Sequence, residues 1–154
     1  MNGRRTPDAN PLVKGTVTGI TLGTSAPMIY RALVEATAYG TRAILERFRN
    51  EGVNIDKIIG IGGISLKSPF VMQTMCNALN TPIKVCRTEQ ACALGAAMFA
   101  AVAAGEFECI EDAQKAMSSG FATEYQPQPD MVGIYDRLYD KYLKLGEFTE
   151  THLS

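Results

Sequence analysis

Short runs of apolar and β-branched residues alternate along this chain with longer segments whose apolar residues recur at helical spacing. Three runs, residues 16–22, 57–61 and 83–86, suit strands, and a segment that suits a helix follows each of them. Strands joined through helices over short connections pair in parallel, with right-handed crossovers. The alternation therefore predicts an α/β fold, with a parallel sheet of about three strands covered by helices. Three strands are few for such a sheet, so we expect further strands to come from outside this chain.

The helical segments have recognisable ends. We expect the first helix to be capped by Thr24 or Ser25 and to run to about Asn50. Further helices are predicted over residues 69–79, 91–104, 110–117 and 130–145. The segment 91–104 is small or apolar on nearly every side, which is typical of a buried helix. The last helix should stop at Gly146, and its tyrosines recur at helical spacing, which indicates packing and not a binding face.

Composition excludes several classes of function. The net charge of −1 leaves no basic field for a polyanion, so we expect no nucleic-acid partner. The longest apolar stretch, residues 91–104, is too short to span a bilayer, and the polar first seven residues do not resemble a signal peptide. Four cysteines without a C-x-x-C pair and a single histidine argue against a metal site. These features predict a cytoplasmic protein with no membrane partner and with reduced, structural cysteines.

Gly60-x-Gly62-Gly63 follows the predicted strand 57–61 and precedes a helix. In open parallel sheets, ligands bind at this end of the strands, and glycines let a ligand approach the main chain. A Walker A loop fails because Leu66 stands before Lys67-Ser68, and a Rossmann fingerprint fails because Ser65 takes the place of its third glycine. A strand-to-helix turn that binds nothing remains an equal alternative on these residues alone.

Three other segments are weaker candidates. Gly23-Thr24-Ser25 could bind phosphate, but the following helix needs a cap there. Glu89 could reach Mg²⁺ through water, but an acid before a helix usually interacts with the helix dipole. The arginines of residues 2–7 could bind phosphate, although a terminal segment of this kind is more often a turn or a frayed end.

Four segments together resemble the C-terminal part of L-ribulokinases, in the FGGY family of carbohydrate kinases. They are residues 2–10 (Asn-Gly-Arg-Arg-Thr-Pro-Asp-Ala-Asn), 36–40 (Ala-Thr-Ala-Tyr-Gly), 62–67 (Gly-Gly-Ile-Ser-Leu-Lys) and 91–97 (Ala-Cys-Ala-Leu-Gly-Ala-Ala). The similarity runs in order from residue 2 to about 145. It implies that residues 1–154 are a C-terminal FGGY domain fragment on the adenosine-binding side, with 105–154 as a helical tail packing on it.

This resemblance implies an actin-like ATPase fold, built from ribonuclease-H-like domains. It also implies an ATP-dependent kinase that phosphorylates L-ribulose at its 5-hydroxyl, in arabinose catabolism. Carried over by position, Gly62 and Gly63 would lie close to the nucleotide, Ile64 would line the adenine or ribose, and Lys67 would stand where many relatives have Asn. The segments that supply the catalytic base and hold most of ATP and Mg²⁺ have no counterpart here. No catalytic residue is therefore expected, and the chain alone should be inactive.

Other readings stay open at this point. Another FGGY kinase, acting on xylulose, ribitol or glycerol, would show the same segments. A non-catalytic α/β domain that assembles through its apolar surface is the alternative outside enzymes, because an open sheet edge favours pairing and a homodimer. A Rossmann-type NAD-binding domain is a third and weaker interpretation.

Overall fold

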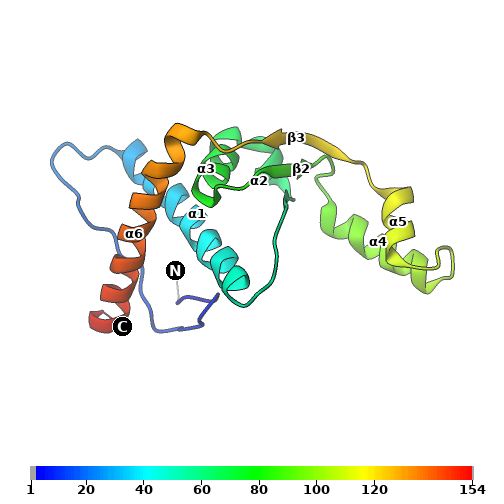
Figure 1. Cartoon of the computed structure of the whole chain (residues 1–154), viewed down its shortest axis with the longest axis horizontal. Coiled ribbons are helices and arrows are strands. Elements are labelled where there is room, and N and C mark those ends of the chain that lie inside the picture. Colours follow the sequence, from blue (N-terminus) through cyan, green and yellow to red (C-terminus); the bar gives the residue numbers. More distant parts are fainter. Residues whose placement is uncertain (1–2, 154) are drawn as a thin grey trace. The chain divides into compact units, whose positions relative to one another are not determined.

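The computed structural model describes residues 3–153 and divides them into two compact units. One unit contains residues 3–56, Thr74–Thr81 and 127–153; the other contains Lys57–Gln73 and Pro82–Gln126. The elements, labelled in Figure 1, are α1 (Ala26–Asn50), β1 (Ile58–Gly60), α2 (Gly63–Lys67), α3 (Pro69–Leu79), β2 (Ile83–Cys86), α4 (Ala91–Ala103), α5 (Ile110–Met117), β3 (Phe121–Tyr125) and α6 (Pro129–His152). The predicted helical tail over 105–154 stays a prediction, and it contains β3 as well as helices.

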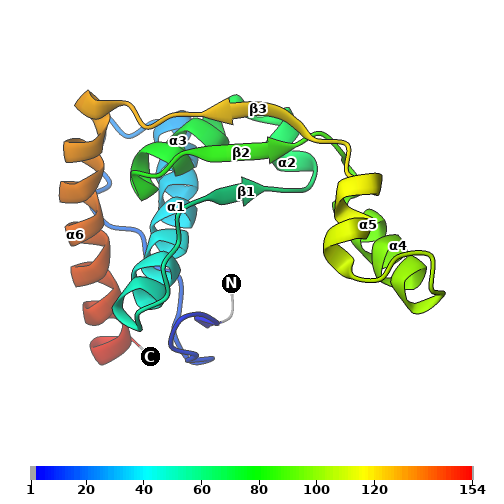
Figure 2. The same ribbon diagram turned by 45° about the vertical axis from the view of Figure 1, so that its right-hand side comes forward.

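The core of the first unit is a tyrosine cluster between α1 and α6, which lie side by side (Figures 1 and 2). The buried ring of Tyr39 lies 6.3, 6.0 and 5.5 Å, between centroids, from the rings of Tyr135, Tyr139 and Tyr142. Tilted aromatic pairs at these distances stabilise a core beyond the area they bury. The structure thus confirms that the tyrosine stripe serves packing.

Arg42 ties α1 to the elements around it. Its Nη1 donates to Asp136 Oδ1 of α6 at 2.6 Å and to the Ala78 carbonyl of α3 at 3.2 Å, and its Nε donates to Glu46 Oε1 at 2.8 Å. The guanidinium also lies 4.4 Å from the centroid of the Tyr139 ring. Hydrogen bonds between charged groups are stronger than neutral ones, so this half-buried cation fixes the packing of the two long helices.

The start of the chain forms a closed turn that is held against α6. Arg4 and Asn10 exchange backbone hydrogen bonds, and the Arg4 guanidinium forms two bonds to Glu150, at 2.9 and 3.1 Å. Asn10 Nδ2 donates to the same carboxylate at 2.8 Å. Arg4 is therefore used in a structural ion pair, as the turn interpretation of residues 2–7 expected; Asn2 lies outside the described residues.

The sheet of the second unit has the order β1-β2-β3, with β2 in the middle (Figure 2). β1 pairs with β2 in parallel, as predicted, but β3 pairs with β2 antiparallel, so the sheet is mixed and not parallel. No strand was predicted over Phe121–Tyr125, where four of the five residues are exposed. The α/β class is confirmed, and the described sheet has three strands, although the third is β3 and not residues 16–22.

Residues 16–22 are not a strand, which corrects the sequence prediction. They carry strand-forming side chains, but no described segment pairs with them. A strand depends on a partner for its backbone hydrogen bonds, so pattern alone does not form one. β1 forms within the predicted range 57–61, but its Ile59 is mostly exposed, whereas a short apolar run is typical of a buried strand.

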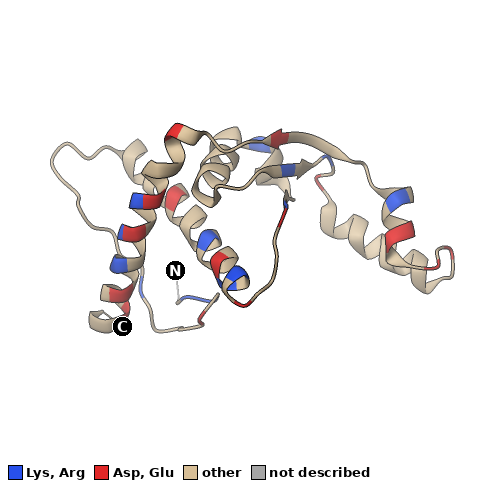
Figure 3. Ribbon diagram, viewed as in Figure 1, with Lys and Arg blue, Asp and Glu red and all other residues tan. Residues whose placement is uncertain are grey.

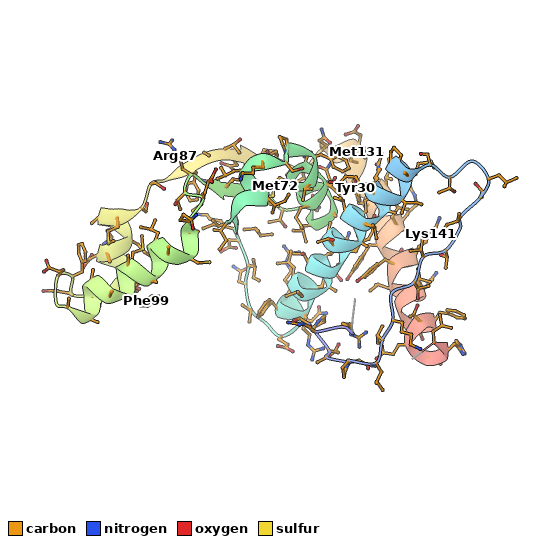
Figure 4. The ribbon with its side chains drawn as sticks, turned by 180° about the vertical axis from the view of Figure 1, so that it is seen from behind. Tyr30, Met72, Arg87, Phe99, Met131 and Lys141 are labelled. Carbon is orange, nitrogen blue, oxygen red and sulfur yellow. The ribbon has the colours of Figure 1, made fainter. Side chains whose placement is uncertain are left out.

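Two helices differ from their predicted form. α4 has the predicted extent to within one residue, but only Met98 along it is buried, and Phe99, labelled in Figure 4, is 65% exposed. Figure 3 shows α4 without a charged residue. α6 does not stop at Gly146 and continues to His152, because Thr149 and Glu150 hold its last turns through contacts with the start of the chain. Such contacts outweigh the ~1 kcal/mol that glycine costs inside a helix. Between residues 3 and 153, no helix combines the length and apolarity that crossing a bilayer requires.

Removing the hydroxyl of Tyr39 should not destabilise the protein. That hydroxyl is buried and has no hydrogen-bond partner among the described residues, and its burial raises the pKa of Tyr39 well above the usual value. Tyr139 is the matched control, because its hydroxyl donates to Glu46 Oε2 at 3.0 Å. In urea denaturation, we expect Tyr39→Phe to leave the unfolding free energy unchanged or higher, and Tyr139→Phe to lower it by about 0.5–1.5 kcal/mol. Equal losses in both variants would contradict this assignment.

The Glu150 ion pair should add stability only above acidic pH. The Asn10 amide and the Arg4 guanidinium lower the pKa of Glu150, so the ionised form favours folding. This contribution is complete above the unfolded pKa of about 4.3 and disappears as the pH falls through the lower folded pKa. We expect Glu150→Gln to be less stable than the parent at pH 7, with the difference shrinking below about pH 4. Glu147→Gln, at an exposed residue of the same helix, is the matched control and should change the unfolding free energy at pH 7 less than Glu150→Gln does.

Candidate functional site

The turn after β1 is held by one buried serine. Gly62 has a φ of 87° and a ψ of 171°, and α2 begins at the next residue. Ser65 is buried, its Oγ donates to the Gly62 carbonyl at 2.7 Å, and its backbone N–H donates to the same oxygen at 3.2 Å. The Ser65 hydroxyl therefore fixes the Gly62 carbonyl. In the direction in which a Cβ of Gly62 would point, no heavy atom lies within 4 Å.

Gly60 lets the following helices approach β1. A Cβ at this residue would lie 2.9 Å from Met72 Cε, 3.4 Å from Ser65 Cβ and 3.6 Å from Ile83 Cγ2. Real Cβ atoms almost never meet another heavy atom at 2.9 Å, so a side chain here would displace Met72. Glycine at this residue therefore lets the flexible end of Met72 pack against β1.

The four predicted site residues lie on this single turn and face open space. A Cβ at Gly62 would have no neighbour within 4 Å, and one at Gly63 would meet only Lys67 Nζ, at 3.9 Å. Ile64 is 60% exposed, and Lys67 is exposed as well. The structure therefore brings bare backbone, an apolar side chain and an ammonium group together at the end of β1. Their roles toward a ligand stay a prediction.

Sequence reasoning missed the two residues that shape the turn. Ser65 was considered only as the residue that breaks a Rossmann fingerprint, and Met72 only as an apolar position of a helix. A serine three residues after a glycine is a local signal for a closed turn and could have been used. The contact of Met72 with Gly60 depends on how α3 packs and has no local signal.

The weaker candidates do not gather into a second site. Thr24 Oγ1 accepts a hydrogen bond from the Thr21 N–H at 2.9 Å, so it closes its own turn. Ser25 occupies the position before α1, but its hydroxyl makes no capping bond, which corrects the predicted cap. Glu89 is exposed ahead of α4. In the part of the chain described, no three His, Cys, Asp or Glu side chains come together as metal ligands.

Comparison with known proteins assigns the domain that carries this turn. Residues 1–104 match the model of the C-terminal domain of the FGGY family of carbohydrate kinases. The chain belongs to this family. The glycine turn lies inside the matched domain, and the resemblance drawn from the sequence is confirmed at the family level.

The curated relatives extend the similarity over nearly the whole chain. The ribulokinase of Vibrio parahaemolyticus is 43% identical over 150 residues, which are 97% of this chain and 26% of that protein. The ribulokinase of Bacillus licheniformis is 44% identical over 148 residues, or 94% of this chain and 27% of that protein. The FGGY chain described here thus spans about a quarter of the length of the relatives it matches.

Solved FGGY kinases share its fold. A ligand-bound xylulose kinase from Lactobacillus acidophilus superposes with a TM-score of 0.83 at 23% identity, covering 96% of this chain and 30% of that one. A xylulose kinase from Rhodospirillum rubrum gives a TM-score of 0.77 at 26% identity, covering 93% and 28%. These likenesses support the predicted fold class, an FGGY domain of the actin-like ATPase type.

The two glycines of the turn should respond differently to alanine. Gly62 has backbone angles that side chains rarely allow, so Gly62→Ala should lower the unfolding free energy by about 1–3 kcal/mol. Gly63 lies in the first turn of α2 with room for a Cβ, so Gly63→Ala should change it by less than about 1 kcal/mol. Chemical denaturation followed by circular dichroism measures both. If Gly63→Ala lowered the unfolding free energy by as much as Gly62→Ala, other atoms would have to pack against the Gly63 backbone.

Proposed function

We propose that this chain supplies the adenosine-binding side of an ATP-dependent FGGY kinase. The observation that carries the proposal is the uncovered backbone at Gly62 and Gly63, which follows directly after a strand of the sheet. Purine rings are flat and need a surface without projecting side chains. Glycines at the carboxyl end of a strand provide such a surface.

The residues beside the glycines suit the other parts of a nucleotide. Ile64 exposes an apolar side chain against which a purine or ribose can lie. Lys67 Nζ comes close to Gly63 and offers a positive charge to a phosphate oxygen. In this proposal Ser65 acts only through the turn, by holding the Gly62 carbonyl away from the ligand.

We further propose L-ribulose as the substrate of the complete enzyme, phosphorylated at its 5-hydroxyl. The relatives of 43% and 44% identity are ribulokinases, whereas the xylulose kinases share 23% and 26% identity. In the same proposal the enzyme is cytoplasmic and takes part in arabinose catabolism. Residues 105–154 would form a tail on the nucleotide-binding domain.

Phosphoryl transfer needs groups beyond those that this chain contributes. It depends on positioned phosphates, Mg²⁺ and an oriented sugar hydroxyl. The described residues hold no cluster of three metal-ligating side chains, and we assign no step through the metal to this chain. What this chain does in the reaction is to orient the adenosine end of ATP, and we expect it to be inactive alone.

Adenosine should perturb this turn in the isolated chain. In ¹⁵N–¹H spectra with millimolar adenosine or ATP, we expect shifts confined to the amides around residues 60–67. Gly63→Val should abolish them, because its side chain covers the backbone without requiring strained angles. Binding should be weak, since few phosphate contacts remain to offset the loss of translational freedom. The same preparation should transfer no phosphoryl group from ATP to L-ribulose.

A second glycine-to-valine variant controls for effects of the substitution that do not depend on the adenosine site. Gly133 in α6 also has open space around it, so Gly133→Val should leave the adenosine shifts unchanged. Adenosine shifts that avoid residues 60–67, or NAD that binds more tightly than ATP, would overturn the proposed site.

A further inference from the structure

Two exposed isoleucines flank the glycines of the turn. Ile61 is 53% exposed and Ile64 is 60% exposed, and Gly62 and Gly63 lie between them in the sequence. All four residues belong to the second unit, in its segment Lys57–Gln73. They present backbone and aliphatic side chains at the end of β1. Aliphatic side chains can contact the flat face of a planar ligand, but they have no group that hydrogen-bonds to its edge.

The polar side chains of the same turn are mostly used within it. The Ser65 hydroxyl is buried and donates to the Gly62 carbonyl at 2.7 Å. Ser68 Oγ accepts a hydrogen bond from the Val71 N–H at 3.4 Å. Of the polar side chains in residues 60–68, Lys67 is the exposed one. Its ammonium group donates hydrogen bonds and cannot accept them.

Adenine and guanine differ at their edges and not in their flat faces. At carbon 6 adenine has an amino donor, whereas guanine has a carbonyl acceptor, and guanine carries a further amino group at carbon 2. A site that hydrogen-bonds to such groups rejects the wrong ligand by about 10⁴-fold or more, because its buried polar groups are then left unpaired. Contacts to the face of a base tolerate base identity, because every base has such a face.

We propose that this turn recognises purine nucleotides as a class and does not distinguish adenine from guanine. The inference rests on the proposed function, because it concerns the same turn. Gly62 and Gly63 face the purine, and Ile61 and Ile64 bury apolar area against it. A purine has two fused rings, so it covers more of this surface than a pyrimidine does. The expected ligands are therefore the nucleotides of adenine, guanine and hypoxanthine.

The role of Lys67 bears on this inference. An ammonium group at the base edge favours guanine, because O6 and N7 of guanine both accept hydrogen bonds. An ammonium group at a phosphate oxygen favours neither base. Lys67→Met removes the charge and keeps an unbranched apolar chain. With Lys67 at the phosphate, this substitution should weaken adenine and guanine nucleotides by the same factor.

Titrations with nucleoside monophosphates test the proposal. The ¹⁵N-labelled 154-residue chain is titrated separately with AMP, GMP, IMP, CMP and ribose 5-phosphate, and the amide shifts of residues 60–67 are followed. We expect the dissociation constants of AMP, GMP and IMP to agree within about threefold, because the three share the flat purine face. CMP should bind more weakly than these, and ribose 5-phosphate, which has no base, more weakly still.

Matched isoleucine variants test where the base lies. Ile64→Ala should weaken AMP and GMP by about threefold or more and leave their ratio unchanged, because a smaller side chain buries less of either purine. Ile134→Ala, at an exposed isoleucine of α6, should change neither dissociation constant. Equal effects of Ile64→Ala and Ile134→Ala would overturn the contact with Ile64.

The possible results separate this inference from the proposed function. If AMP shifts residues 60–67 but differs from GMP or IMP by more than about threefold, the adenosine site stands and the shared recognition of purines is wrong. A changed ratio of AMP to GMP in Lys67→Met would also overturn that shared recognition. Ribose 5-phosphate binding as tightly as AMP would show that the turn does not contact the base. If no ligand shifts these amides, the proposed function fails and this inference fails with it.

Discussion

The turn of the candidate site lies beside Gly60, where the lack of a side chain leaves room for close packing. Because this residue has no Cβ, Met72 of α3 and Ser65 of α2 can both approach the end of β1. That approach places Ser65 where its hydroxyl reaches the Gly62 carbonyl. The hydrogen bond then orients the turn so that the backbone of Gly62 and Gly63 faces open space. The close packing at Gly60, two residues before Gly62, and the open space beside Gly62 thus belong to one turn.

Much of the local structure follows from sequence. β2, α3 and α5 have the predicted bounds, and the end of α1 is also as predicted. Each has a local cause: Pro69 begins α3, and the Gly52 N–H closes the end of α1 on the Arg49 carbonyl. Helices satisfy their own backbone groups, so their limits can be recognised from nearby residues. The chain order of α1, α3, α4, α5 and α6 and the position of the glycine turn were predictable for the same reason.

The strands were harder to predict than the helices, because a strand depends on a pairing partner elsewhere in the chain. β3 forms from mostly exposed residues because β2 offers it an edge, with Ile83 opposite Tyr125. Residues 16–22 have the better strand composition and yet remain unpaired. The difference between them lies in the partner and not in the sequence of the strand. In the site, the glycines were predictable from their place after β1, whereas the packing of Met72 required the position of α3.

The two largest disagreements between sequence and structure have one physical explanation. Residues 16–22 and α4 both carry the pattern of buried elements, and both expose most of their apolar side chains in this chain. An apolar pattern indicates that a segment is stable when it is buried. Burial requires other polypeptide to pack against the segment. The matched kinases supply such polypeptide, since this chain covers only 26–30% of the two relatives and two solved structures compared above. The patterns of both segments therefore indicate an environment that the described residues of this chain do not supply.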